Sequence, residues 1–125
     1  MASSIDDITV GYFKYLETKE DDYFWAWLAV DDMCHSLPEG MQITLRLIEQ
    51  APTKWVRDCV AAHALEDLVN RLGTLAVQEI DCLATGSKAL RLALPVVNVN
   101  EDSEVFELWE QLLNRHKEGD DGTAL

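Results

Sequence analysis

Hydrophobic side chains recur along this chain at intervals of three and four positions, the spacing that gathers them on one face of an α-helix. Only residues 95–100, rich in valine and asparagine, favour a strand. One short strand cannot form a sheet, so we expect an extended connector there. The clearest helical stretch lies near the carboxyl end, where one side collects Val105, Phe106, Leu108, Trp109, Leu112 and Leu113 and the other collects Glu104, Glu107 and Glu110.

Capping residues divide the chain into separate helices. Ser4 opens a sequence that resembles a capping box, Thr53 is a predicted N-cap, and Ser87 begins a short helix before a proline. Gly73 is typical of a helix C-terminus, and we expect Thr74 to cap the next helix. Residues 54–72 form either one helix or two helices joined near residues 62–64. The predicted helices span residues 4–19, 22–36, 39–50, 54–72, 75–84, 87–94 and 102–116.

Short turns between these helices predict an all-α fold, a compact antiparallel array of about 6–8 short helices. A HEAT-like stack of helix pairs has the same pattern and stays open as an alternative. The chain has 125 residues, a size typical of one domain, and 48% of them are hydrophobic, enough for a core. We expect a single all-α domain over residues 1–116, followed by a flexible polar tail over residues 117–125.

Acidic residues outnumber basic residues by 23 to 10, which gives a formal net charge of −13. A field of this sign repels the phosphates of nucleic acids and the anionic lipids of membranes, and it attracts basic protein surfaces. We therefore expect a protein partner with a basic surface, no direct binding to nucleic acid and no association with a membrane. The pattern indicates no particular oligomeric state.

The chain also lacks signals for export. Residues 1–7 have neither a basic segment nor an apolar one, and the longest uncharged apolar run, residues 23–30, is too short to span a bilayer. Cys34, Cys59 and Cys82 are odd in number and widely spaced, so they predict reduced thiols and no disulfide framework. These features favour a cytoplasmic protein.

Four polar residues lie among hydrophobic ones and are predicted to be buried structural groups. Asp31 falls within the apolar arc of residues 22–36, with His35 one turn further on. The two could form an acid–base pair, but a buried carboxylate paired with an arginine such as Arg71 is the interpretation we favour. Glu66 and Asp67 begin another hydrophobic stripe, where acidic residues favour the helix dipole.

Candidate chemistry is otherwise sparse. Cys59 and His63 have the i, i+4 spacing of two metal ligands, but no second Cys/His pair has that spacing. We therefore expect no metal site there, and a core thiol beside a core histidine instead. The chain contains no phosphate-binding glycine loop, zinc-protease motif or serine-nucleophile motif. The prediction is a protein that is not an enzyme and needs no cofactor.

Many of the acidic residues are concentrated in two segments, and almost no lysine is interleaved among the acidic residues of either segment. Such a stripe can dock into a basic groove and accelerate association. A tight interface also needs an aromatic anchor, and Trp25, opposite Asp31 on its helix, is the candidate. The predicted partner-binding residues are Glu17, Glu20, Asp21, Asp22, Trp25, Glu101, Asp102, Glu104, Glu107 and Glu110.

Two stretches resemble an uncharacterised family of small, acidic, helical bacterial proteins. Residues 24–33 read FWAWLAVDDM and residues 61–69 read AAHALEDLV, and the likeness spans about residues 12–73. The chain departs from the family at His63 and Ala64, where a Gly-Pro turn is expected.

The general look of this family is similar to that of immunity proteins, which protect bacteria from toxins delivered between cells. The resemblance implies a cytoplasmic immunity or inhibitor protein whose acidic face covers a basic site on a cognate toxin, such as a nuclease. The alternative is a non-inhibitory interaction module, such as an adaptor or effector chaperone, or a phage-encoded inhibitor of a defence complex.

Overall fold

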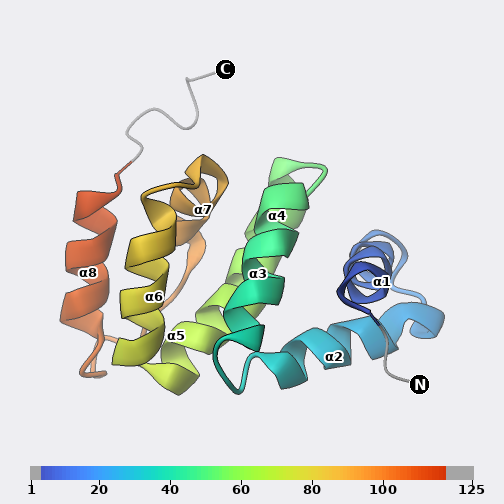
Figure 1. The fold of residues 1–125 in the computed structure, drawn as a ribbon, viewed down its shortest axis with the longest axis horizontal. Coiled ribbons are helices and arrows are strands. Elements are labelled where there is room, and N and C mark those ends of the chain that lie inside the picture. Colours follow the sequence, from blue (N-terminus) through green and yellow to red (C-terminus); the bar gives the residue numbers. More distant parts are fainter. Residues whose placement is uncertain (1–3, 118–125) are drawn as a thin grey trace.

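The computed structural model describes residues 4–117, and the regular secondary structure of this part of the chain is entirely helical, with no strand in it (Figure 1). Helix α1 (Ile5–Thr18) begins where its capping residue predicts, because the Ser4 hydroxyl accepts a 3.0 Å hydrogen bond from the Asp7 amide. A short 3₁₀ turn (Asp21–Tyr23) leads into α2 (Phe24–Met33), and α3 (Glu39–Gln50) has the predicted bounds. Residues 118–125, in which the polar tail is predicted, lie outside the described residues.

Residues 54–72 form one continuous helix, which settles the alternative that the sequence leaves open. It consists of α4 (Lys54–Val60), a π-helical segment (Ala61–Leu65) and α5 (Glu66–Leu72). The Thr53 hydroxyl caps its first turn at 3.1 Å from the Val56 amide. The π-helical segment occupies the position where the family resemblance predicts a turn.

The remaining helices are α6 (Thr74–Ala84), α7 (Lys88–Ala93) with a 3₁₀ turn (Leu94–Val96), and α8 (Phe106–Arg115). Thr74 is not an N-cap as predicted: Gly73, with a φ of +57°, reverses the chain, and Thr74 is already the first residue of α6. Residues 101–105 form turns, because the Asn100 side chain accepts from the Asp102 amide and Ser103 from the Val105 amide. Such local bonds compete with helix formation.

The helices from α3 onward run alternately up and down beside one another, while α1 and α2 pack together at one end (Figure 1). Counting α4 and α5 as one, the described residues hold seven helices, which confirms the predicted all-α array. The array is compact, and residues 4–117 show no helical repeat. Helix α8 lies at the opposite end of the long axis from α1.

The core extends through the whole array and depends on two close approaches between helices. A Cβ atom added to Gly11 would lie 2.8 Å from the Cβ of Ala26, and one added to Gly40 would lie 2.7 Å from the Met33 carbonyl oxygen. Glycine therefore lets α1 meet α2 and lets α3 meet the end of α2. The largest buried side chains include Tyr12, Met41, Ile43, Leu47, Leu65, Leu68, Ile80, Leu94 and Trp109.

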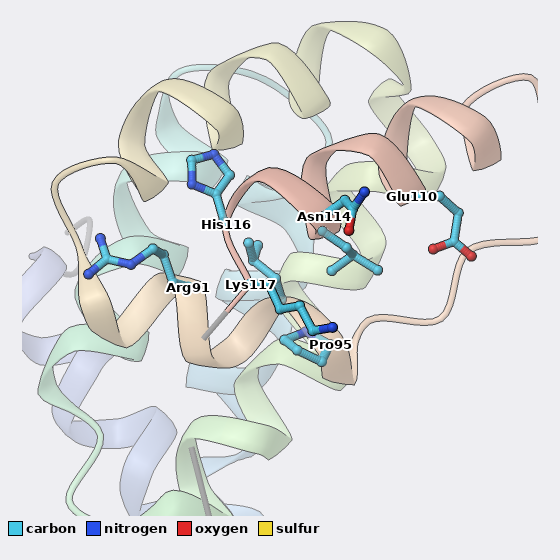
Figure 2. Close-up of a pocket in the computed structure, with 8 residues that line it drawn as sticks. Arg91, Pro95, Glu110, Asn114, His116 and Lys117 are labelled. Carbon is cyan, nitrogen blue, oxygen red and sulfur yellow. The ribbon is translucent and has the colours of Figure 1, made fainter. Parts of the chain in front are cut away.

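A pocket of about 570 Å³ lies between α7 and α8 (Figure 2). Leu94, Pro95 and Leu113 provide an apolar part of its lining. Two of its lining side chains bond to α6 and the residue after it: the Arg91 guanidinium donates to the carbonyl oxygens of Ala84 and Thr85, and His116 lies 2.6 Å from Asp81. The pocket walls are therefore held by contacts among α6, α7 and α8.

Candidate functional site

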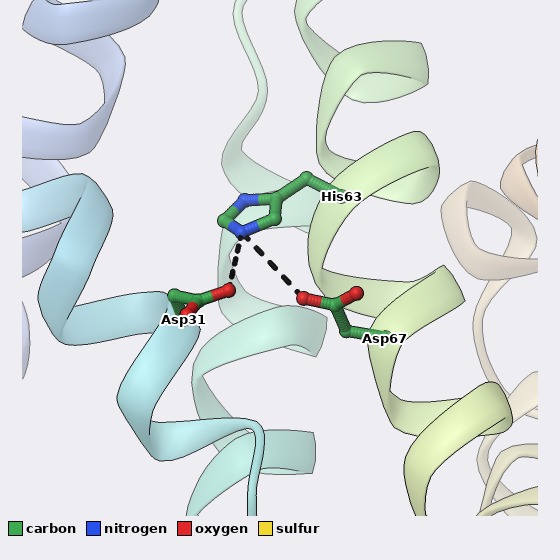
Figure 3. A group of neighbouring side chains, drawn as sticks. All are labelled: Asp31, His63 and Asp67. Carbon is green, nitrogen blue, oxygen red and sulfur yellow. Dashed lines mark hydrogen bonds and ion pairs between the residues drawn. The ribbon is translucent and has the colours of Figure 1, made fainter.

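His63 is the centre of the most connected group of polar side chains in the described residues. Its Nε2 atom lies 3.3 Å from Oδ1 of Asp31 in α2 and 3.8 Å from Oδ2 of Asp67 in α5 (Figure 3). The two carboxylates approach the ring from different helices. The group therefore joins α2 to the continuous helix formed by α4 and α5.

The backbone explains how His63 reaches this position. It is the middle residue of the π-helical segment, where each turn holds an additional residue and side chains are rotated relative to an α-helix. Asp67 is four residues further along, so it lies on the same side of the helix as His63. Single π-helical turns of this kind occur frequently at functional sites.

Aromatic rings hold the imidazole of His63 in one orientation. The Tyr12 hydroxyl lies 2.8 Å from Nδ1, and the Tyr12 side chain is fully buried. The Trp27 ring stacks on the imidazole with centroids 4.1 Å apart and planes 2° from parallel. Both ring nitrogens of His63 consequently face a polar group on another helix.

Arg71 balances the charge of the two carboxylates. Its guanidinium lies 3.7 Å from Oδ1 of Asp31 and 3.8 Å from Oδ2 of Asp67, which confirms the predicted pairing of Asp31 with an arginine. The alternative that the sequence leaves open, an acid–base pair of Asp31 and His35, is not what forms. His35 is exposed and bonds to the Arg71 guanidinium, because the chain turns away after α2 ends at Met33.

The electrostatic environment shifts the pKa values of Asp31 and Asp67 in opposite directions. Burial acts to raise the pKa of Asp31, but hydrogen bonds with His63 and Asp67 and the charge of Arg71 outweigh it and hold the pKa below its usual value. Burial and the hydrogen bond to Asp31 raise the pKa of Asp67. Burial also raises the pKa of Tyr12 far above its ordinary range, so this hydroxyl keeps its proton.

The four predicted structural acids and bases are less buried than the sequence indicates. Asp31, Glu66 and Asp67 are half-buried, and His35 is exposed. Glu66 accepts a 2.7 Å hydrogen bond from the Asn98 amide, so it fixes the connector between α7 and α8 to the side of α5. That contact joins residues 32 positions apart, a distance at which sequence patterns carry no signal.

The predicted partner-binding residues are all exposed, but they form two groups at opposite ends of the molecule (Figure 1). Glu17, Glu20, Asp21, Asp22 and Trp25 belong to the α1–α2 end, and the rest belong to the α8 end. There, Glu101, Glu104, Glu107 and Glu110 surround a hollow of about 480 Å³ that also contains Ser103 and Phe106.

Sequence reasoning places His63 beside Cys59 and misses its real partners. In the described residues, the potential ligand group contains His63 with Asp31 and Asp67, and Cys59 is not part of it. The i, i+4 spacing of His63 and Asp67 is a signal that could have been read, whereas the approach of Asp31 is not visible in the sequence. The four pockets at α7–α8, at α1–α4, beside Asn98 and at the α8 end are lined by residues other than these three.

These features define an all-helical protein, over the described residues, with a half-buried histidine–carboxylate group between helices and acidic surfaces at both ends. The chain belongs to the family of unknown function DUF6869, with a match over residues 14–118. Membership of an uncharacterised family is thereby confirmed, and the match extends beyond residue 73 to residue 118. Neither curated proteins nor solved structures gave a match. Among the described helices, none is long and apolar enough to cross a membrane.

Proposed function

We propose that this protein binds and neutralises a basic protein partner, in the manner of an immunity protein that covers the active surface of a cognate toxin such as a nuclease. The observation that carries the proposal is the hollow at the α8 end, where four glutamates surround Phe106. A hollow with an acidic rim and an aromatic wall is complementary to a projecting lysine or arginine side chain.

The scaffold supports a preformed acidic surface. Trp109 and Leu112 are buried on one side of α8, which packs against α6. Glu107 and Glu110 are three positions apart on the outer side, and Glu104 is exposed in the turn before the helix. Because the buried side fixes the helix, its glutamates need little reordering on binding, which lowers the cost of association.

The same hollow supplies the apolar contact that charge alone cannot provide. Exposed charges mainly accelerate association, while affinity depends on buried apolar anchors. Phe106 is half-buried in the hollow, and Leu108 on the same helix is partly exposed. Trp25 is in α2 at the other end of the molecule, so it is not part of this hollow.

The two acidic groups make a matched test possible. One variant carries Glu104→Lys, Glu107→Lys and Glu110→Lys, and its control carries Glu17→Lys, Glu20→Lys and Asp21→Lys. Both change the net charge by the same amount. We expect the α8 variant to lose capture of the partner from native lysate and the control to retain most of it, with capture by the natural protein weakening at high salt.

Protection of living cells separates inhibition from simple binding. Coexpression of the protein with a toxin encoded beside it should restore growth, and the α8 variant should not. Capture without protection would favour an adaptor or effector chaperone, and a phage gene neighbourhood would favour an inhibitor of a defence complex. Equal capture by both triple variants would exclude the α8 surface as the interface.

A further inference from the structure

Three side chains around His63 have the composition and spacing of metal ligands. Nε2 of His63, a carboxylate oxygen of Asp31 and one of Asp67 all lie within 4.8 Å of one another. They come from two elements, α2 and the continuous helix of α4 and α5 (Figure 3). All three groups are half-buried, so an ion can reach them from solvent without unfolding the protein.

The two distances from His63 are close to those around a tetrahedral ion, and the two carboxylate oxygens lie within 4.8 Å of each other, so they have to approach as an ion binds. Zinc binds histidine nitrogen and carboxylate oxygen at about 2.0–2.2 Å, which places neighbouring tetrahedral ligands about 3.3–3.6 Å apart. The distances from Nε2 are 3.3 Å to Asp31 and 3.8 Å to Asp67. The first already matches, and the second needs a shift of only a few tenths of an ångström.

Tyr12 provides the outer contact that such a histidine requires. A ligating histidine donates its other ring N–H to a neighbouring acceptor, which fixes its orientation. When Nε2 binds an ion, the ring proton is on Nδ1, and the Tyr12 oxygen 2.8 Å away can accept it. Without an ion, the same hydroxyl can donate to Nδ1. The hydrogen bond therefore survives the change of tautomer.

Arg71 does not occupy the ligand positions. Its contacts with Asp31 and Asp67, at 3.7 and 3.8 Å, are longer than hydrogen bonds, so the guanidinium balances charge without using the oxygen lone pairs. Its hydrogen bond goes to His35 instead.

We propose that Asp31, His63 and Asp67 bind a divalent transition-metal ion of the zinc class. One imidazole and two carboxylates suit zinc and its neighbours better than calcium or magnesium, which prefer oxygen ligands alone. The three protein ligands leave a fourth position for water. The bound ion fastens α2 to the helix formed by α4 and α5, a role separate from the acidic surface at α8.

Cobalt is the spectroscopic probe for this site. The purified full chain, freed of metal with a chelator, is titrated with Co²⁺ and then with Zn²⁺. We expect the visible absorption of tetrahedral Co²⁺, saturation at one ion per chain and its loss when Zn²⁺ is added. The same protein without a saturable cobalt spectrum would overturn the proposal.

Variants then locate the ion. Asp67→Asn should weaken Co²⁺ binding at least about a hundredfold, since changes to outer contacts alone cost about 10- to 100-fold. Tyr12→Phe should weaken it within that smaller range. His63→Gln should abolish the spectrum, and if that variant does not fold, Asp67→Asn decides the question.

Two controls test the other places where an ion could bind. Cys59→Ser removes the thiol that the sequence places near His63, and His116→Gln removes the imidazole that contacts Asp81. Both should leave Co²⁺ affinity unchanged. Loss of the spectrum in either control, or full binding by a folded His63→Gln variant, would refute the assignment to Asp31, His63 and Asp67.

Discussion

The hydroxyl oxygen of Tyr12 lies 2.8 Å from Nδ1 of His63, a residue 51 positions further along the chain. Tyr12 is buried in α1, and His63 is in the π-helical segment, so this contact ties the amino-terminal helix to the centre of the array. Tyr12 is fully buried, so its hydroxyl cannot bond to bulk water and bonds to His63 instead. The orientation of the imidazole, and therefore its approach to Asp31, depends on this bond.

Replacing Tyr12 with phenylalanine should lower the free energy of unfolding by about 1–3 kcal/mol. The change removes only the hydroxyl oxygen but leaves a ring nitrogen of His63 without its partner, and an unsatisfied polar group costs about that much. Urea denaturation monitored by circular dichroism measures the effect. Tyr15→Phe is the control and should change the unfolding free energy by less than about 0.5 kcal/mol, because that ring is only half-buried. Equal effects would show that the Tyr12 bond contributes nothing.

The substitutions Asp31→Asn and Asp67→Asn should change the free energy of unfolding at pH 7 by different amounts or in opposite directions. The lowered pKa of Asp31 means that the fold favours its charged form, so we expect Asp31→Asn to cost about 1 kcal/mol. The raised pKa of Asp67 means that the fold disfavours its charge, so Asp67→Asn should be neutral or stabilising. Denaturation of both metal-free variants checks the prediction. A larger loss at Asp67 would contradict the assignment of the charge to Asp31.

Gly40→Ala should destabilise the protein although alanine is the better helix former. The new Cβ would lie 2.7 Å from the Met33 carbonyl oxygen and 2.9 Å from the Cα of Cys34, and neither backbone atom can rotate away. Overpacking of this kind costs about 1–3 kcal/mol. Gly86→Ala is the matched control, since nothing lies within 4 Å of its added Cβ. Thermal unfolding should show a lower midpoint for the Gly40 variant alone.

Asp81 should make stability depend on acid pH. Its hydrogen bonds with His116 and Arg115 outweigh burial and hold the pKa of the carboxyl below its usual value. A lowered pKa in the folded state means that the stabilisation is complete above the unfolded pKa of about 3.9 and is lost as the pH falls through the folded value. Unfolding free energies measured from neutral to strongly acid pH should therefore decline less steeply in Asp81→Asn. An unchanged slope would show that Asp81 contributes nothing in this range.

The helix boundaries were largely predictable because capping is local. The Ser4, Thr53 and Ser87 hydroxyls each accept a bond from an amide three residues later, as predicted. The boundary of α8 was not predictable in this way, because Asn100 and Ser103 bond to nearby amides and delay the helix. Both kinds of boundary depend on hydrogen bonds between residues close in the sequence. A sequence pattern does not show whether a polar side chain will cap a helix or form a turn before it.

At Gly11, helix propensity and tertiary packing predict opposite effects of a substitution by alanine. By propensity alone, Gly11 weakens the first helix, and alanine would strengthen it. In the folded protein the added Cβ would press against Ala26 and Trp25, so glycine is what lets α1 and α2 pack closely. The sequence identifies the residue, but the packing of a second helix decides its effect.

The candidate sites follow the same division. Hydrophobic periodicity and capping, which act over three or four residues, determined the all-α class and most helix bounds. Only the tertiary structure brings together Tyr12, Asp31 and His63. It also places the acidic residues in two groups at opposite ends of the molecule. The physical reason is that these relationships depend on how helices pack against one another. This packing depends on the volumes of the side chains and on the π-helical turn. Neither can be read from the spacing of residues along the chain.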